Sequence, residues 1–279
     1  MTLPFFTPDA DPGPDFAGLL RRQNRDPDVR IVEAATHPLT ITHGTTVVAI
    51  RTAGGVVMAG DRRATSGNLI AHRSMEKVFP ADRWSGVAIA GAAGPAMEMV
   101  RLFQLQLEHY EKVEGHPLSL EGKANQLSQM VRNHLPAAMQ GMAVVPLFAG
   151  YDVARGIGRL FEFDVTGGRY EELHHAATGS GSLHAGTVVK IGYRPEIPPQ
   201  EAVDLAIRAL FEAADDDSAT GGPDLIRGIF PIVAVIDADG FRRLGDDEVR
   251  ARFEAILGQL SPSTTHGADY GPDDEEPNR

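Results

Sequence analysis

Residues 42–51 read Thr-His-Gly-Thr-Thr-Val-Val-Ala-Ile-Arg, and this stretch decides where the folded domain begins. From Thr45 onward it is rich in β-branched residues, which favours a strand. A second run of this kind, Val56–Gly60, follows after Ala53-Gly54-Gly55. Paired glycines supply the positive φ angles that tight turns need, so we expect an antiparallel hairpin at the start of the domain.

The two ends of the chain differ in composition from this hairpin. Residues 1–44 hold six of the 19 prolines, several of them among aspartates, and show little helical or strand periodicity. We interpret them as a leader, although composition alone equally allows an ordinary disordered arm. Residues 261–279 carry five carboxylates against the single cation Arg279, which predicts an acidic, disordered tail.

Between these ends, residues 45–260 are interpreted as one domain in which strands and helices alternate in blocks. The expected strands are Thr45–Arg51, Val56–Gly60, Trp84–Gly91, Val144–Asp152, Gly158–Asp164, Arg169–His174, Ile229–Asp237 and Gly240–Leu244. The expected helices are Pro95–Glu114, a second one capped by Ser119, Gln200–Ala214 and Asp246–Leu260. Blocks without strict βαβ repetition indicate antiparallel sheets covered by helices, an α+β layered sandwich.

Composition limits the chemistry and the partners. The 279 residues include 42% hydrophobic ones, enough for a sizeable core, and carry a net charge of −12, which disfavours binding to nucleic acid or anionic lipid. The chain has no cysteine, which excludes disulfides and thiolate chemistry and fits a reducing compartment. It contains neither a membrane-spanning apolar run nor a secretory signal, so we expect a cytoplasmic protein that acts on protein or peptide.

Several familiar motifs are missing from the sequence. We find no phosphate loop, no His-Glu-x-x-His zinc helix and no dinucleotide fingerprint, and we expect no metal or cofactor. His174 and His175, as neighbours at a strand end, point to opposite faces and make a poor metal site. The run Thr178–Ser182 does not fit the Gly-x-Ser-x-Gly elbow, so we expect its small residues to permit close backbone approach, with the serine hydroxyls free to bond neighbours.

The Gly44–Thr45 junction offers a chemical hypothesis. Cleavage there would give Thr45 a free α-amine beside its hydroxyl, so that nucleophile and base lie on one residue. An α-amine has a pKa near 8 and can accept the hydroxyl proton at cellular pH. A glycine at position 44 suits the contorted peptide that self-cleavage requires, whereas the alternative interpretation is a plain linker glycine.

The segments that follow Thr45 resemble the β subunit of the 20S proteasome, most closely its actinobacterial type. The resemblance spans essentially all of 45–260 and is carried by the Thr-Thr-Val-Val start and by these further motifs: Gly60-Asp61-Arg62-Arg63-Ala64-Thr65, Met75-Glu76-Lys77, Ala90-Gly91-Ala92-Ala93-Gly94, Gly179-Ser180-Gly181 and Asp217 before Gly221-Gly222. It implies the four-layer αββα sandwich of N-terminal nucleophile hydrolases. It also implies that residues 1–44 are a propeptide removed by autocatalysis between Gly44 and Thr45.

The resemblance further implies roles for individual residues. Thr45 would be the nucleophile of a threonine endopeptidase, and the ion pair of Asp61 and Lys77 would lie beside it, where an ammonium favours alkoxide character. Ser180 and Asp217 would bind the new amine. Thr220 would add a further hydroxyl, where many members have serine and the extra methyl of threonine needs room. The Gly91 N–H would bind the oxyanion, and the backbone of Thr65 would pair with extended substrate. An apolar substrate pocket would be formed by Ala64, Met75, Phe79, Ile89 and Ala93.

As partners, the resemblance implies other β subunits in seven-membered rings, flanking rings of α-type subunits, a ring-shaped ATPase that acts through them, and unfolded polypeptide as substrate. Three alternatives stay open. The chain could be a subunit of the simpler two-ring bacterial threonine protease, a non-protease amidase of the same nucleophile class, or a catalytically silent structural ring subunit. Silent subunits usually lack the threonine or the lysine, and this chain keeps both Thr45 and Lys77.

Overall fold

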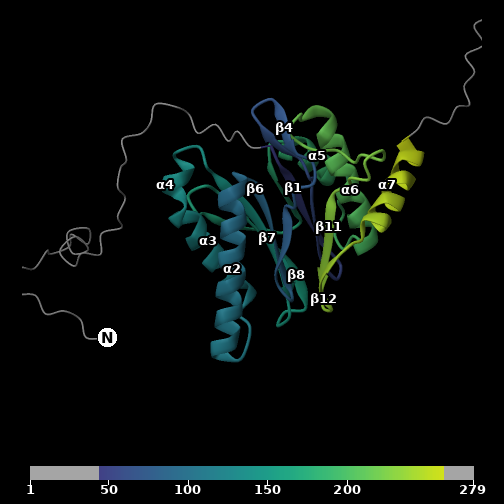
Figure 1. Ribbon diagram of the computed structural model, residues 1–279. Helices are drawn as coiled ribbons and strands as arrows, with labels where there is room; N and C mark the ends of the chain where they lie inside the picture. The colour runs from purple at the N-terminus through teal and green to yellow at the C-terminus, as the bar shows by residue number, and fades with distance from the viewer. Residues whose placement is uncertain (1–43, 261–279) are drawn as a thin grey trace, which may run out of the picture. The chain divides into compact units, whose positions relative to one another are not determined.

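The computed structural model describes residues 44–260 (Figure 1), so the predicted leader before Gly44 and the predicted acidic tail 261–279 lie outside the described residues. Within this part the elements form two five-stranded sheets and one two-stranded sheet. Every strand pair is antiparallel, as the block pattern of the sequence predicted.

The first sheet contains the predicted opening hairpin. Its strand order is β10-β1-β2-β11-β12. The strands are β1 (Thr46–Thr52), β2 (Gly55–Gly60), β10 (His175–Gly179), β11 (Ile232–Asp237) and β12 (Gly240–Arg243). Because β10 pairs with β1 in the register Thr46↔Gly179, the end of β10 lies beside the Gly44–Thr45 junction.

The second sheet has the order β5-β6-β7-β8-β9. Its strands are β5 (Val78–Asp82), β6 (Ser85–Gly91), β7 (Val144–Asp152), β8 (Ile157–Phe163) and β9 (Arg169–Glu172). A separate hairpin joins β3 (Ala64–Ser66) to β4 (Leu69–His72), and β4 is exposed along its whole length.

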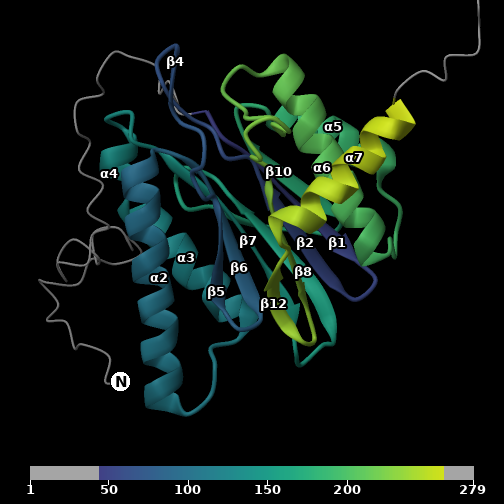
Figure 2. The same ribbon diagram turned by 45° about the vertical axis from the view of Figure 1, so that its right-hand side comes forward.

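Helices cover the outer face of each large sheet. Figures 1 and 2 show one helix layer on the first sheet and another on the second. The first layer consists of α5 (Ser182–Gly192), α6 (Pro199–Asp216) and α7 (Asp246–Leu260), and the second of α2 (Ala93–Glu114), α3 (Leu120–Asn133) and the short α4 (Leu135–Ala138).

Three hydrophobic cores separate these four layers. Along β1, Val48 and Ile50 pack under α5 and α6, whereas Val47 and Ala49 pack against the second sheet. This alternation follows from the two-residue period of a strand, and it explains why β1 is apolar on both faces. The third core lies between the second sheet and α2 and α3. The four-layer αββα sandwich is therefore confirmed.

The structure adds elements that the sequence pattern did not predict. The strand expected at Arg169–His174 ends at Glu172, and a separate strand, β10, begins at His175. The helix α5 was missed because it contains two glycines and the β-branched run Thr187-Val188-Val189, all poor helix formers. Burial of Ala185 and Val189 against the first sheet outweighs that propensity. The strand β5 was missed because Pro80 interrupts its pattern at a bulge.

Candidate active site

Thr45 lies immediately before β1, buried with 4% of its surface exposed. Its hydroxyl donates a hydrogen bond to the carbonyl oxygen of Gly44 over 2.7 Å. Its N–H donates to Ser180 Oγ over 3.4 Å, and its own carbonyl accepts the Ser180 N–H over 2.8 Å. The side-chain oxygen therefore contacts the peptide group that self-cleavage would break, with Ser180 on the amine side of that bond.

Two glycines permit this close packing. A Cβ atom on Gly44 would lie 1.9 Å from the Cβ atom of Ala219, so neighbouring packing leaves no room for any other residue there. Gly179 has a φ of +104°, and a Cβ atom on it would lie 1.8 Å from the carbonyl oxygen of Thr45. The prediction that the Thr178–Ser182 run permits close backbone approach is confirmed.

Asp61 and Lys77 form a fully buried ion pair between the two large sheets. Lys77 Nζ donates to Asp61 Oδ1 over 2.6 Å and to the carbonyl oxygen of Arg63 over 2.5 Å. Asp61 Oδ1 also accepts the N–H of Thr46 over 2.8 Å. Asp61 Oδ2 accepts the N–H groups of Arg63 and Gly221, both over 2.8 Å. Thr46, the residue next to Thr45, therefore shares a carboxylate oxygen with the buried ammonium.

The burial of this pair changes the charge balance at Lys77. Desolvation lowers the pKa of Lys77 below its usual value, against the raising effects of the Asp61 carboxylate and of its hydrogen bond. The nearby guanidinium of Arg63 lowers it further, and Asp217 raises it. The Lys77 ammonium therefore holds its proton less tightly than an exposed lysine does.

A second polar network lies on the other side of Thr45. Asp217 Oδ2 accepts hydrogen bonds from Ser180 Oγ over 2.5 Å and from Thr220 Oγ1 over 2.6 Å. Thr46 Oγ1 lies 2.5 Å from Thr220 Oγ1 and accepts the Gly181 N–H over 2.9 Å. Because Thr220 donates to Asp217, Thr46 is left to donate to Thr220, and the hydroxyls form a directed chain that ends at the carboxylate.

Hydrogen bonds keep Asp217 ionised. Burial by itself would raise its pKa, but the hydrogen bonds from Ser180, Thr220 and the Ala219 N–H outweigh burial, so the pKa of Asp217 lies below its usual value. Thr220 is fully buried and its hydroxyl bonds Asp217, so the site accommodates the extra methyl group of threonine.

Sequence reasoning missed Thr46. Its hydroxyl joins the Gly181 N–H to Thr220, and its N–H binds Asp61, so it connects both polar groups. A threonine that starts a strand is ordinary by β propensity, so only its position directly after Thr45 could have drawn attention to it.

The other predicted site residues lie on several different elements. Gly91 ends β6, and Thr65 in β3 accepts the Gly44 N–H at its hydroxyl over 3.4 Å. Among the predicted pocket residues, Ile89 is buried in the core under α2, and Phe79 packs against that core. The structure does not bring Ala64, Met75 and Ala93 into the same core, so a single pocket formed by all five stays a prediction.

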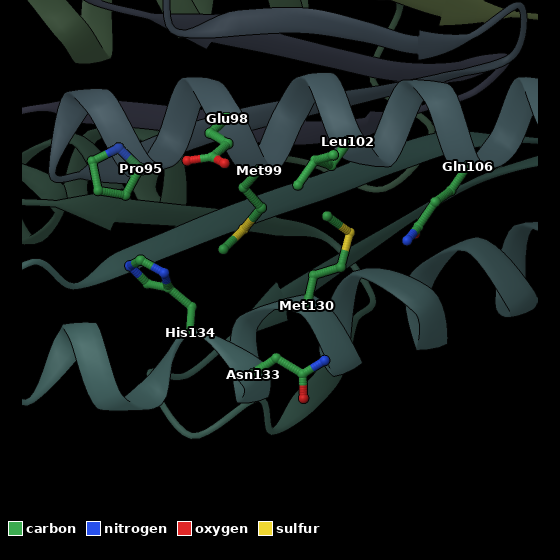
Figure 3. Close-up of a pocket in the computed structure, with 8 residues that line it drawn as sticks. All are labelled: Pro95, Glu98, Met99, Leu102, Gln106, Met130, Asn133 and His134. Carbon is green, nitrogen blue, oxygen red and sulfur yellow. The ribbon is translucent and has the colours of Figure 1, made fainter.

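A cavity of about 390 Å³ lies between α2 and α3, and none of the residues that line it is a predicted site residue (Figure 3). Met99 from α2 and Met130 from α3 point toward each other in it, and His134 lies at its α4 end.

Within residues 44–260, no group of three or more His, Asp or Glu side chains is placed to hold a metal ion. No helix in this part of the chain is long and apolar enough to cross a membrane.

The four-layer antiparallel sandwich is the fold of the N-terminal nucleophile hydrolases. Residues 41–226 match the family model described as proteasome subunit. The chain is 60% identical over 262 residues to a proteasome subunit beta of Acidimicrobium ferrooxidans, which covers 93% of each chain. It is 63% identical over 215 residues to that of Streptomyces griseus (77% of this chain, 76% of the relative). It is 58% identical over 228 residues to that of Acidothermus cellulolyticus (80% and 79%). The chain therefore belongs to the proteasome subunit family, as a β-type subunit of the 20S core and a protein-degrading hydrolase.

Proposed function

We propose that this chain is a threonine-type endopeptidase whose nucleophile is Thr45 and whose residues 1–44 are a propeptide removed by autocatalysis. The observation that carries the proposal is the buried contact of 2.7 Å between Thr45 Oγ1 and the carbonyl oxygen of Gly44. Reacting atoms lie about 3–3.5 Å apart in a productive geometry, and the Thr45 hydroxyl, in hydrogen-bond contact with the Gly44 carbonyl oxygen, already lies against the group that it would attack.

Self-processing follows from this geometry in two steps. Thr45 Oγ1 adds to the carbonyl carbon of Gly44, its proton passes to Thr45 N, and the C–N bond breaks, leaving an ester between Gly44 and the Thr45 oxygen. Water then hydrolyses the ester, which frees a carboxylate at Gly44 and both the hydroxyl and the amine of Thr45. The Lys77 ammonium, held by Asp61, favours the alkoxide character of the attacking oxygen.

The mature site would repeat this chemistry on other polypeptides. The free amine of Thr45 accepts the hydroxyl proton, the oxygen attacks a substrate carbonyl, and the proton is delivered to the leaving amine. The resulting ester is released by water. Ser180 and Asp217 support the amine by hydrogen bonds, and the Gly91 N–H would stabilise the oxyanion.

Family membership supports further proposals on assembly. The chain would form seven-membered rings of β subunits, stacked in pairs and flanked by rings of α-type subunits, in the cytoplasm. A ring-shaped ATPase acting through the α rings would supply unfolded polypeptide as substrate. Enclosure of this kind restricts the reaction to chains that have been unfolded and threaded.

The N-terminus of the assembled β chain tests the proposal. The chain should be co-expressed with its α-type partner and its intact mass measured in the purified particle. We expect the wild type to begin at Thr45, and Thr45→Ala to retain residues 1–44 and to hydrolyse no peptide. Thr45→Ser keeps a hydroxyl and should still be processed, which controls for the effect of substitution itself. Processing or peptide hydrolysis by Thr45→Ala would refute the assignment of the nucleophile.

A further inference from the structure

A second cavity, of about 320 Å³, lies between the ends of the two large sheets and is lined by Ser180, which binds the Thr45 N–H. Its walls include Gly91 at the end of β6 and Val145 in β7, facing Gly179 and Ser180 at the end of β10. Two of these residues, Gly91 and Ser180, belong to the candidate active site. The cavity is large enough for an amino-acid side chain and is continuous with the proposed chemistry.

The contacts of the Gly44–Thr45 bond show which side of a cut bond the cavity serves. Gly44, on the acyl side, donates its N–H to Thr65 in β3. Thr45 N, on the amine side, donates to Ser180 Oγ. Because Ser180 lines the cavity and Thr65 does not, the cavity lies on the amine side. The acyl part of a substrate would follow Gly44 on the Thr65 side, which leaves the cavity on the Ser180 side for the residue that follows the cut bond.

Glu162 is the one charged side chain that lines this cavity. It lies in β8 two residues beyond Leu160, whose side chain is in the core between the two sheets. Strand residues two apart share a face, so Glu162 also points between the sheets, and its pairing with Leu147 of the same core agrees.

Glu162 is half-buried and has no hydrogen bond or ion pair with another side chain within residues 44–260. Burial raises its pKa, and the charge of Glu172 on the neighbouring strand raises it further. Buried carboxylates are ordinarily paired with a cation. This cavity has a negative wall, no cation among its lining residues and a second carboxylate nearby. It is therefore suited to receive a positive group.

We propose that this cavity is the subsite for the residue that follows the cut bond, and that Glu162 selects lysine or arginine there. The inference rests on the proposed role of Thr45, because the orientation of the substrate is taken from the Gly44–Thr45 bond. Glu162 would act by binding the substrate side chain and would take no part in bond cleavage. Selection would appear as a ratio of kcat/KM values between substrates that differ only at this residue.

The test uses assembled particles and peptides that share one sequence before the cut and carry Lys, Gln or Glu after it. Cleavage products at that bond are quantified by mass spectrometry, with the peptides in competition. We expect the wild type to prefer Lys over Gln by about tenfold, as a charged hydrogen bond contributes. Glu162→Gln should bring this ratio close to one, and Glu162→Lys should instead prefer Glu over Gln. Glu111→Gln, an exposed change on α2, should keep the wild-type ratio.

The outcomes separate this inference from the proposed function. If particles whose β chain begins at Thr45 cleave none of the peptides, the proposed function fails. If the wild type cleaves them without favouring Lys, or if Glu162→Gln keeps the preference, only the role of Glu162 is overturned. Should Glu162→Lys fail to assemble, the nearly isosteric Glu162→Gln still decides the question.

Discussion

Replacing Asp61 by asparagine should damage both stability and processing, because the side chain satisfies four donors at once. Oδ1 accepts from the Thr46 N–H and the Lys77 ammonium, and Oδ2 accepts from two backbone N–H groups. Asparagine offers one acceptor oxygen and one NH₂ group. Whichever way its amide turns, the NH₂ faces two donors, and the charge of Lys77 loses its counterion in a fully buried position.

Removing one partner of a buried ion pair costs about 3–5 kcal/mol, and a typical domain is stable by only about 5–15 kcal/mol. We therefore expect Asp61→Asn to lower the free energy of unfolding of the full-length chain by about 3–5 kcal/mol, measured by urea denaturation. In co-expressed particles it should also leave residues 1–44 attached. The control Asp247→Asn, exposed in the first turn of α7, should change stability by less than about 0.5 kcal/mol. An Asp61→Asn chain that unfolds like the wild type and still begins at Thr45 would refute the reasoning.

Three further predictions follow from contacts around the junction. Gly44→Ala should block processing, because its Cβ atom would overlap both the side chain and the backbone of Ala219. Intact mass measures the effect, and a variant that is processed like the wild type would contradict the steric account. Thr46→Val removes the hydroxyl that accepts the buried Gly181 N–H, so it should lower the free energy of unfolding by about 1–3 kcal/mol, measured by urea denaturation. Thr46→Ser keeps the hydroxyl and should be nearly neutral. Equal losses in the two variants would show that the hydroxyl is unimportant. Because the folded pKa of Asp217 lies below its unfolded value, its carboxylate stabilises the chain above about pH 4, and this stabilisation is lost as pH falls through the folded pKa. Urea unfolding of wild type and Asp217→Asn should therefore differ at pH 7 and converge at low pH, and a constant difference would contradict this linkage.

Much of the fold could be predicted from local patterns. The opening hairpin and the two long helices α2 and α3 have clear periodicity, and Ser119 caps α3 by accepting the Gly122 N–H as expected. The helix α5 could not be predicted in this way, because its glycines and β-branched residues oppose helix formation and only packing against the first sheet stabilises it.

Some residues of the candidate site could likewise be predicted from the sequence, and others could not. Asp61 and Lys77 could be assigned from the family motifs, and the structure pairs them directly. The hydroxyl of Thr46 could not, because its partners Gly181 and Thr220 lie more than a hundred residues away in the chain and meet it only in the folded state. Glu162 carried no motif either, and its importance depends on a cavity that two different sheets create.

The position of Thr45 is fixed by apolar packing at some distance from the chemistry. The strand β1 buries Val48 and Ile50 on one face and Val47 and Ala49 on the other. A slip of one residue would exchange these two sets between cores of different shape, so packing specifies the register strongly. The register in turn sets Thr46 opposite Gly179, which brings Thr45 within reach of Ser180. Apolar packing of β1 therefore positions Thr45 for its contacts with the polar groups. For this reason a short motif at the start of a strand is enough to place the proposed nucleophile.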